Sequence, residues 1–280
     1  MSVLPHPGTG VPLPSPAPPG SGWPGDPATA ETPVATDAAG VARLAADTPA
    51  LADLDAAVSV CRACPRLVAW REQVAREKRA AYAGEPYWGR PAPSLGDPDA
   101  RALIVGLAPA AHGANRTGRM FTGDRSGDWL FAALHRAGFA SQPTATHAGD
   151  GLRLTGVRIT ASVHCAPPAN KPTTVETATC GLWLDRELTL LEPQLGGVLA
   201  LGSLAWNATI AAARRLGWSV PRPKPAFGHE ATASLGLPSG RSLALIGCYH
   251  VSQQNTFTGR LTEEMLLSAL ARLKESSLRA

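Results

Sequence analysis

Four of the five cysteines in this sequence form two pairs whose spacing could hold a metal centre. Cys61 and Cys64 are separated by two residues, and Cys165 and Cys180 by fourteen. Such thiolates bind zinc or an iron–sulfur cluster, and the wide second pair is less typical of structural zinc. Cys248 lies in an apolar run, so we expect it to be a buried strand residue and not a ligand.

The stretch from Gly106 to Asp124 combines small residues with groups that could bind a planar ligand. Its glycines and alanines let the backbone approach a ligand, although their spacing matches neither a P-loop nor a dinucleotide-binding motif. Phe121 could stack on a flat ring or pack on the following helix. Asp124 could present a carboxylate to a ligand or cap that helix. Three further polar side chains could contact a ligand: Asn115, Arg116 and Arg119.

Two more candidate residues follow apolar runs later in the chain. Asn170 lies in a proline-rich loop, and its amide could read the edge of a nucleobase or form a local Asx turn. His250 follows the apolar run 243–247 and could act on a ligand or be structural. The sequence alone leaves both alternatives open for each residue.

The candidate residues follow short apolar runs that are typical of buried parallel strands. These runs cover 102–106, 157–163, 198–201 and 243–247, and helices are expected over 51–60, 66–81, 126–138, 174–191, 203–216 and 261–276. Alternating strands and helices predict an α/β fold, a three-layer sandwich around a central, mainly parallel four-stranded sheet. Ligands of such sheets bind beyond the carboxyl ends of the strands, so the polar loops should meet there.

The first fifty residues differ in composition from the rest of the chain. They are rich in Pro, Gly and Ala and hold one basic and four acidic residues. Such a segment buries too little apolar surface to offset its ordering entropy. We therefore expect a disordered tail over 1–50, whose removal leaves activity intact, and a single α/β domain over 51–280.

Charge and hydropathy narrow the possible partners. Residues 51–280 hold 25 basic and 18 acidic side chains, a balance that favours a polyanion such as nucleic acid. The sequence has no apolar run of about 18 residues, which argues against a membrane-spanning helix. Its N-terminus lacks the basic and apolar regions of a secretory signal, so we expect a cytoplasmic protein.

Taken in order, these motifs resemble those of the iron–sulfur uracil-DNA glycosylases, and among them the family 5 (type B) group. The matching segments are Cys61-x2-Cys64, Gly106–Ala110, Gly118–Asp124, Cys165–Pro172, Cys180 and Tyr249–Gln253. The resemblance covers roughly 55–275 of the chain. Several motifs in the same order are more specific than any one of them alone.

The resemblance implies a uracil-glycosylase-like sheet with a [4Fe–4S] cluster. The implied cluster ligands are Cys61, Cys64, Cys165 and Cys180. The implied base-binding residues are Ala108, Ala110, Phe121 and Asn170, with Phe121 stacking on the base and Asn170 reading its edge. The implied catalytic residues are Asp124, near the reacting sugar, and His250, at the leaving base.

The activity implied by the resemblance is excision of uracil from DNA by hydrolysis of the N-glycosidic bond, which leaves an abasic site for base excision repair. The target base must first be flipped out of the duplex. Related family 4 enzymes have an acidic residue where this chain has Leu107. That difference fits the broader substrate range implied for family 5, which includes hypoxanthine and ethenocytosine.

Two other functions are weighed against this one. The first is a non-catalytic, metal-stabilised nucleic-acid-binding protein, which the presence of Asp124, Asn170 and His250 together disfavours. The second is a covalent uracil-DNA trap, but the basic insert of that relative is missing before His250.

The expected partner is double-stranded DNA, with single-stranded DNA as a second candidate, bound by a monomer at the nucleoid. Residues 253–257 could wedge into the gap left by the base, although we expect Phe257 to be a core residue.

Overall fold

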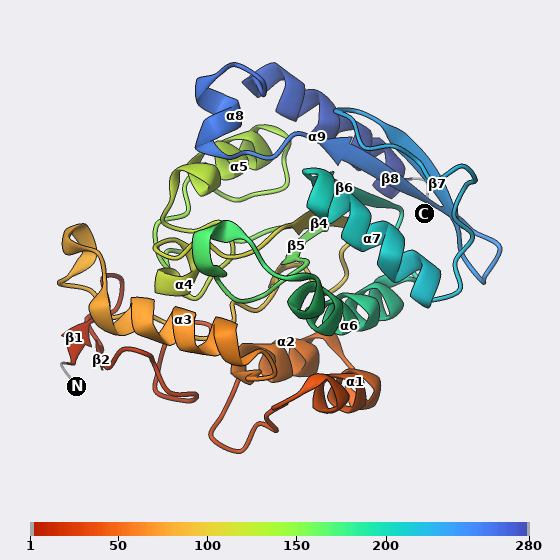
Figure 1. The fold of residues 1–280 in the computed structure, drawn as a ribbon. Helices are drawn as coiled ribbons and strands as arrows, with labels where there is room; N and C mark the ends of the chain where they lie inside the picture. Colours follow the sequence, from red (N-terminus) through yellow and green to blue (C-terminus); the bar gives the residue numbers. More distant parts are fainter. Residues whose placement is uncertain (1–2, 279–280) are drawn as a thin grey trace.

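The computed structural model describes residues 3–278, with a mixed sheet at its centre (Figure 1). Four adjacent strands are parallel: β5 (Val157–Ala161), β4 (Ala102–Gly106), β6 (Gly197–Leu201) and β8 (Ser242–Cys248). Two short strands pair antiparallel at the edges: β3 (Leu95–Gly96) and β7 (Thr232–Gly236). The sheet order is β3-β5-β4-β6-β8-β7. The predicted parallel strands are confirmed, and the sheet has six strands where four were expected.

The two edge strands lack the pattern by which the central strands were predicted. Every residue of β4, β5 and β6 is buried, because helices cover both faces, and these strands are apolar apart from Arg158 and Thr160 of β5. In β7 only Leu235 is fully buried, and β3 has just two residues. An exposed or very short edge strand therefore carries no continuous apolar signal.

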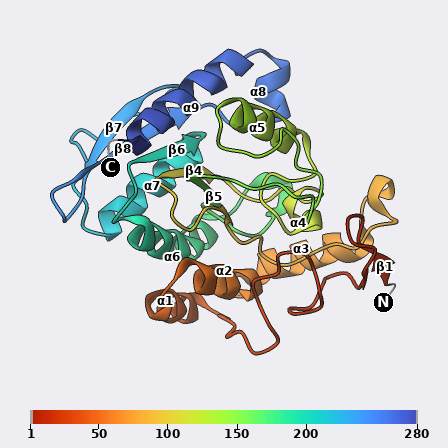
Figure 2. The ribbon, with the colours of Figure 1, turned by 180° about the vertical axis from the view of Figure 1, so that it is seen from behind.

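Helices cover both faces of the sheet and complete a three-layer sandwich (Figures 1 and 2). One face packs against α5 (Arg125–Arg136) and α9 (Glu263–Leu278). The other packs against α1 (Ala38–Asp47), α2 (Leu51–Val60), α6 (Thr174–Leu191) and α7 (Ser203–Arg215). Helix α3 (Pro65–Glu77) ends before the expected boundary because Lys78 adopts a φ of 57°. No helix within residues 3–278 has the length and apolar character needed to cross a membrane.

The last central strand settles the role of the fifth cysteine. Cys248 is the final residue of β8 and is fully buried in the core between the sheet and α9. This confirms the prediction that it is a strand residue.

The first fifty residues differ from the expected disordered tail. Residues 3–26, which we call the N-terminal strap, run along one end of the molecule and include the short strands β1 (Leu4–Pro5) and β2 (Pro12–Leu13) (Figure 1). Leu13 and Trp23 are buried against Trp88, and Asp26 forms a buried ion pair with Arg90 at 2.5 Å. A few apolar anchors and one ion pair order this segment, which its average composition does not reveal.

Candidate active site

A pocket of about 470 Å³ opens at the carboxyl ends of the parallel strands. Its walls come from the stretch after β4, the loop after β5 and the segment after β8, the three loops that the sequence places at this edge. Six candidate residues line it: Ala108, Ala110, Phe121, Asp124, Asn170 and His250. Its volume lies within the range of about 300–1,000 Å³ that is usual for small-molecule sites.

The Phe121 ring forms one wall of the pocket. The residue has a φ of 50°, a left-handed conformation that is uncommon for a bulky side chain and often marks a functional site. The ring lies over Gly106, where a Cβ would come within 3.0 Å of the Phe121 Cζ atom. Its centroid is 6.3 Å from that of the His250 imidazole, and the two planes are tilted by 36°. Phe121 is half-buried, so its ring can also meet a planar ligand.

Asp124 combines the two roles considered for it. Its Oδ1 atom accepts a hydrogen bond from the Gly127 amide at 3.0 Å and so caps α5. Its Oδ2 atom lies beside Gly113, where a Cβ would be only 2.0 Å away. Burial raises the pKa of this carboxyl, while the amides of Gly127 and Ser126 act in the opposite direction. The carboxyl group thus caps α5 and also lines the pocket, where a ligand can meet it.

His250 lies directly beyond the carboxyl end of β8. Asn255 donates from Nδ2 to the carbonyl of His250 at 2.8 Å and fixes the turn of the chain after it. Burial lowers the pKa of the imidazole to about 4. At neutral pH the ring is therefore uncharged, with one nitrogen able to donate a hydrogen bond and the other able to accept one.

Asn170 belongs to a short 3₁₀ turn, Pro168–Asn170, in which two successive residues are left-handed. Ala169 has a φ of 52°, which is strained for alanine, and Asn170 has a φ of 56°, which asparagine tolerates better than other non-glycine residues. The Asn170 side chain is exposed and makes no hydrogen bond with any described residue, so the alternative of an Asx turn is not what the structure shows. Its amide is instead left for a ligand.

Arg66 fixes the Asn170 loop, a contact that the sequence analysis missed. From α3 it donates through Nη2 to the carbonyl of Lys171 at 3.2 Å and forms an ion pair with Glu176 at 2.6 Å. Glu176 also completes the capping box of α6 with Thr173. The only sequence signal was that capping box, because Arg66 lies more than a hundred residues before Lys171.

Ala108 and Ala110 bring no polar side-chain group to the pocket. Within residues 3–278, the amides of Ala108, Ala110 and Ala111 donate to no other backbone group, while the Ala110 carbonyl accepts from Gly113 and Asn115, each at 3.2 Å. The wall is therefore apolar in its side chains and keeps backbone donors of the kind that stabilise a developing negative charge.

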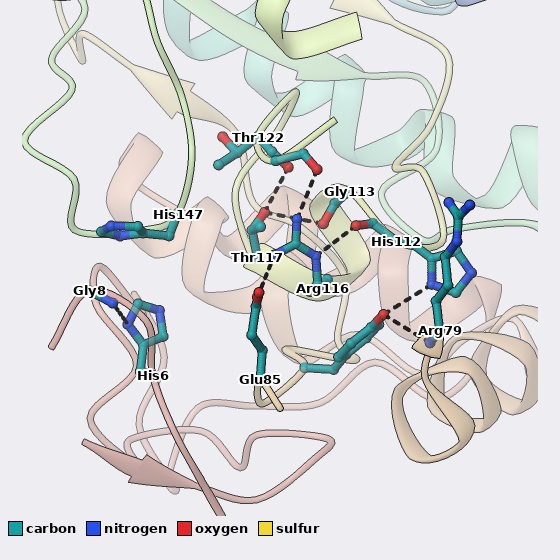
Figure 3. A network of polar contacts seen from close by, with 12 residues as sticks. His6, Gly8, Arg79, Glu85, His112, Gly113, Arg116, Thr117, Thr122 and His147 are labelled. Atoms are coloured by element: carbon teal, nitrogen blue, oxygen red, sulfur yellow. Dashed lines mark hydrogen bonds and ion pairs between the residues drawn. The ribbon is translucent and has the colours of Figure 1, made fainter. Parts of the chain in front are cut away.

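Arg116 braces the stretch that carries Asp124 (Figure 3). It donates through Nε to the carbonyl of His112 at 2.9 Å and through Nη2 to the carbonyl of Gly123 at 2.8 Å. Its Nη1 atom pairs with Glu85 at 2.6 Å. One buried guanidinium thus ties both ends of the stretch together and fixes the residue directly before Asp124.

The three polar residues of this stretch are scaffold residues, which corrects their assignment as possible ligand contacts. Asn115 and Arg116 are buried, and Arg119 forms a two-pronged ion pair with Asp150 at 2.7 and 2.8 Å. None of the three lines the pocket. Their hydrogen bonds hold in place the stretch between β4 and α5, in which the short helix α4 (Ala114–Thr117) is a single turn.

The two cysteine pairs meet at a second, small apolar cavity. Cys61 and Cys64 lie between α2 and α3, Cys165 follows β5, Cys180 lies on α6, and all four line this cavity. Burial, reinforced by the neighbouring thiols Cys165 and Cys61, raises the pKa of Cys64 to about 12. Within the described part of the chain, no three Cys, His, Asp or Glu side chains are close enough to share one metal ion. The four thiols around this cavity are a donor set of the kind that holds an iron–sulfur cluster, in which each thiolate binds its own iron.

Two polar side chains around this cavity also fit an electron-rich centre. Arg71 is buried, donates through Nη1 to the Cys165 sulfur at 2.9 Å, and keeps an Nε group without a partner among the described residues. His164 is buried with its Nδ1 atom 2.8 Å from the carbonyl of Ala92, and its Nε2 atom is likewise unpartnered. Buried polar atoms normally find partners, and the sulfur atoms of a cluster would supply acceptors here.

The rim of the pocket carries exposed cations and an exposed aromatic ring. Lys171 lines the pocket, Arg125 follows Asp124, and Arg260 lies over the ring of Tyr249 at 4.7 Å, beside His250. None of these three cations forms an ion pair with a described acidic residue. Phe257, on α8 (Gln253–Phe257), is 67% exposed, so the expectation that it belongs to the core is wrong.

Comparisons with known proteins agree on one family. The profile of the uracil DNA glycosylase superfamily matches residues 93–274. A relative from Mycobacterium bovis, named type-5 uracil-DNA glycosylase, is 56% identical over 261 residues, which cover 93% of this chain and 94% of the relative. Relatives of the same name from Thermus thermophilus and Pyrobaculum aerophilum are 51% and 43% identical, over 78% and 76% of this chain and 94% and 87% of their own lengths.

Proposed function

Because this chain belongs to the uracil-DNA glycosylase superfamily and to its type-5 group, we propose that it excises uracil from DNA by hydrolysing the N-glycosidic bond. The product is an abasic site, the intermediate of base excision repair. The observation that carries the proposal is the meeting of Phe121, Asp124, Asn170 and His250 around one pocket of about 470 Å³.

Bond cleavage separates positive charge on the sugar from negative charge on the base. The outward oxygen of Asp124, once ionised, stabilises the cationic sugar and can orient the attacking water. The neutral imidazole of His250 donates a hydrogen bond to the leaving base, and the backbone amides near Ala108 and Ala110 add to this stabilisation. Phe121 stacks on the flipped base and Asn170 pairs with its edge.

The apolar side chains of the pocket wall support a broad choice of bases. A site rejects an analogue strongly when its own polar groups would be left unpaired, and Ala108 and Ala110 have none in their side chains. We therefore extend the proposed substrates to hypoxanthine and ethenocytosine.

Cys61, Cys64, Cys165 and Cys180 are the proposed ligands of a [4Fe–4S] cluster. When bound, this group acts as a structural cross-link between α3, α6 and the loop after β5. Cys165 lies five residues before Asn170, so that link also fixes the base-reading loop. Iron and sulfide analysis, together with broad absorbance near about 400 nm, tests this assignment.

Duplex DNA is the proposed partner, bound by a monomer at the nucleoid, and single-stranded DNA is a second proposed substrate. Lys171 lines the pocket, Arg125 follows Asp124 in the chain and Arg260 lies over Tyr249, so these three cations can contact phosphates that flank the flipped nucleotide. Phe257 is exposed beside them, 5.2 Å from the Arg125 guanidinium, where it can enter the gap left by the base.

The test is incubation of the purified protein with a duplex that contains one U·G pair, followed by alkali. Strand scission at the uracil supports excision, and the same duplex with a C·G pair is the control. An intact strand with retarded mobility would instead support a non-catalytic binding protein. A strand that stays attached to the protein in denaturant would support a covalent trap.

A further inference from the structure

Arg71 is a buried cation for which the described protein offers no acidic partner. It is 1% exposed, and no ion pair between described residues includes it. The three other buried arginines each pair with a carboxylate: Arg90 with Asp26, Arg116 with Glu85, and Arg158 with Asp55 at 2.7 Å and Glu187 at 2.6 Å. An unpaired buried guanidinium is costly, so Arg71 needs a source of negative charge nearby.

The contacts of Arg71 point to the cysteine cavity as that source. Its Nη1 atom lies 2.9 Å from the Cys165 sulfur and its Nη2 atom 3.0 Å from the Cys61 carbonyl, so the guanidinium reaches across both cysteine pairs. Arg71 follows Cys64 by seven residues, two turns of α3, and therefore lies on the same side of the helix. Its Nε group is unpartnered among the described residues and belongs to a side chain that lines the cavity.

We propose that Arg71 is a positioning residue of the iron–sulfur centre, which neutralises part of its negative charge and donates hydrogen bonds to its sulfur atoms. This inference rests on the cluster assigned under the proposed function. A [4Fe–4S] centre with four thiolates carries net negative charge, and hydrogen bonds to its sulfurs and nearby charge set its potential. A fixed cation favours the more negative, reduced form, so Arg71 should make the centre harder to oxidise.

The experiment compares Arg71→Met and Arg71→Lys with the native protein, all purified anaerobically with their iron. Arg71→Met removes both the charge and the donors, and Arg71→Lys keeps the charge without the planar fork. Arg76→Met is the matched control, because Arg76 lies on the same helix but is half-exposed and only 3.6 Å from Glu72 at the surface.

Two readouts are measured on these proteins. The first is loss of absorbance near about 400 nm after addition of ferricyanide, which takes one electron from the centre and becomes ferrocyanide. The second is the midpoint potential of the centre. We expect Arg71→Met to bleach about 10-fold faster than the native protein and to have a more negative potential. Arg71→Lys should lie between the two, and Arg76→Met should match the native protein.

The potential separates a charge effect from a packing effect. The Arg71 carbonyl accepts from Asn115 Nδ2 at 3.2 Å, so a packing change could reach the pocket through α4 (Ala114–Thr117) and alter activity alone. An unchanged potential and bleaching rate in Arg71→Met would overturn the proposal. If that variant does not fold, a native bleaching rate in Arg71→Lys would overturn it. Native protein without iron would instead refute the cluster itself.

Discussion

At Asp124, one substitution can separate the capping of α5 from the role of the carboxylate charge in excision. Asn caps helices about as well as Asp, so Asp124→Asn should keep the bond to Gly127 and the stability of α5 while removing the negative charge. We expect the single-turnover rate of uracil excision to fall by about 10²–10³-fold. Asp37→Asn is the control, because Asp37 caps α1 in the same way, at 2.7 Å from the Gly40 amide. A native rate in Asp124→Asn would contradict the assigned role.

The pH dependence of excision should follow the same carboxylate. Burial raises the pKa of Asp124, so its ionised form is lost at a higher pH than for an exposed aspartate. The excision rate of the native protein should therefore fall as pH drops through this raised pKa. Burial lowers the pKa of His250 to about 4, so the imidazole is already uncharged at neutral pH, where the profile begins. The small residual rate of Asp124→Asn, measured under single-turnover conditions, should not show this fall at low pH. If the fall is retained in the variant, it belongs to another group.

His250 should act as a neutral hydrogen-bond donor. His250→Ala removes that donor without changing the charge of the pocket, and we expect a loss of about 10²–10³-fold in the rate. Because the imidazole is largely buried, the substitution should also lower the melting temperature modestly, so the rate is measured well below melting. His135→Ala, at an exposed position on α5, is the control. Ring-nitrogen NMR of the native protein near neutral pH provides an independent check, and a charged imidazole there would refute the proposed state.

At the scale of elements, α5 and the Phe121 wall depend on one close backbone contact. A Cβ at Gly127 would lie only 1.8 Å from the Phe121 carbonyl oxygen, so Gly127→Ala must push the first turn of α5 away from Phe121. We expect the free energy of unfolding to fall by about 1–3 kcal/mol. The flipped base should also bind more weakly, which would be measured as a higher KM. Gly84→Ala is the control, because nothing lies within 4 Å of its added Cβ. Unchanged melting and KM values in Gly127→Ala would contradict this account.

The same scale shows what the sequence could and could not predict. The parallel strands were predicted because each is a short, mostly apolar run of consecutive residues, and the Gly/Pro-rich loops mark where those strands end. Arg116 and Arg71 could not be interpreted in this way. Arg116 pairs with Glu85, which lies 31 residues away, and Arg71 contacts Cys165, 94 residues away. A polar residue in a loop looks like a ligand contact until its distant partner is known.

At the scale of the whole molecule, the N-terminal strap is linked by hydrogen bonds to the stretch that carries Asp124. Trp23 donates from Nε1 to the Thr117 carbonyl at 3.1 Å, and its ring lies 5.6 Å from that of Trp88. The Thr117 hydroxyl in turn lies within hydrogen-bond distance of the Thr122 carbonyl, at 3.2 Å, and of the Gly113 and Arg119 carbonyls, each at 3.3 Å. Two hydrogen bonds therefore connect the strap to the residues just before Asp124, which makes the strap part of the scaffold of the catalytic stretch.

This connection predicts that the strap supports catalysis as well as stability. Trp23→Ala should cost about 3–5 kcal/mol of stability and, because α4 loses its brace, should also slow excision at temperatures well below melting. Val34→Ala is the control, since Val34 is 44% exposed and its substitution should change neither value. Melting temperature and single-turnover rate are measured on the same samples. If the strap only covers apolar surface, Trp23→Ala will have a lower melting temperature but will excise uracil at the native rate well below that temperature. Deletion of residues 1–26 will then give the same two results. A fall in both quantities in both proteins is the result expected if the strap helps to hold Asp124 in place.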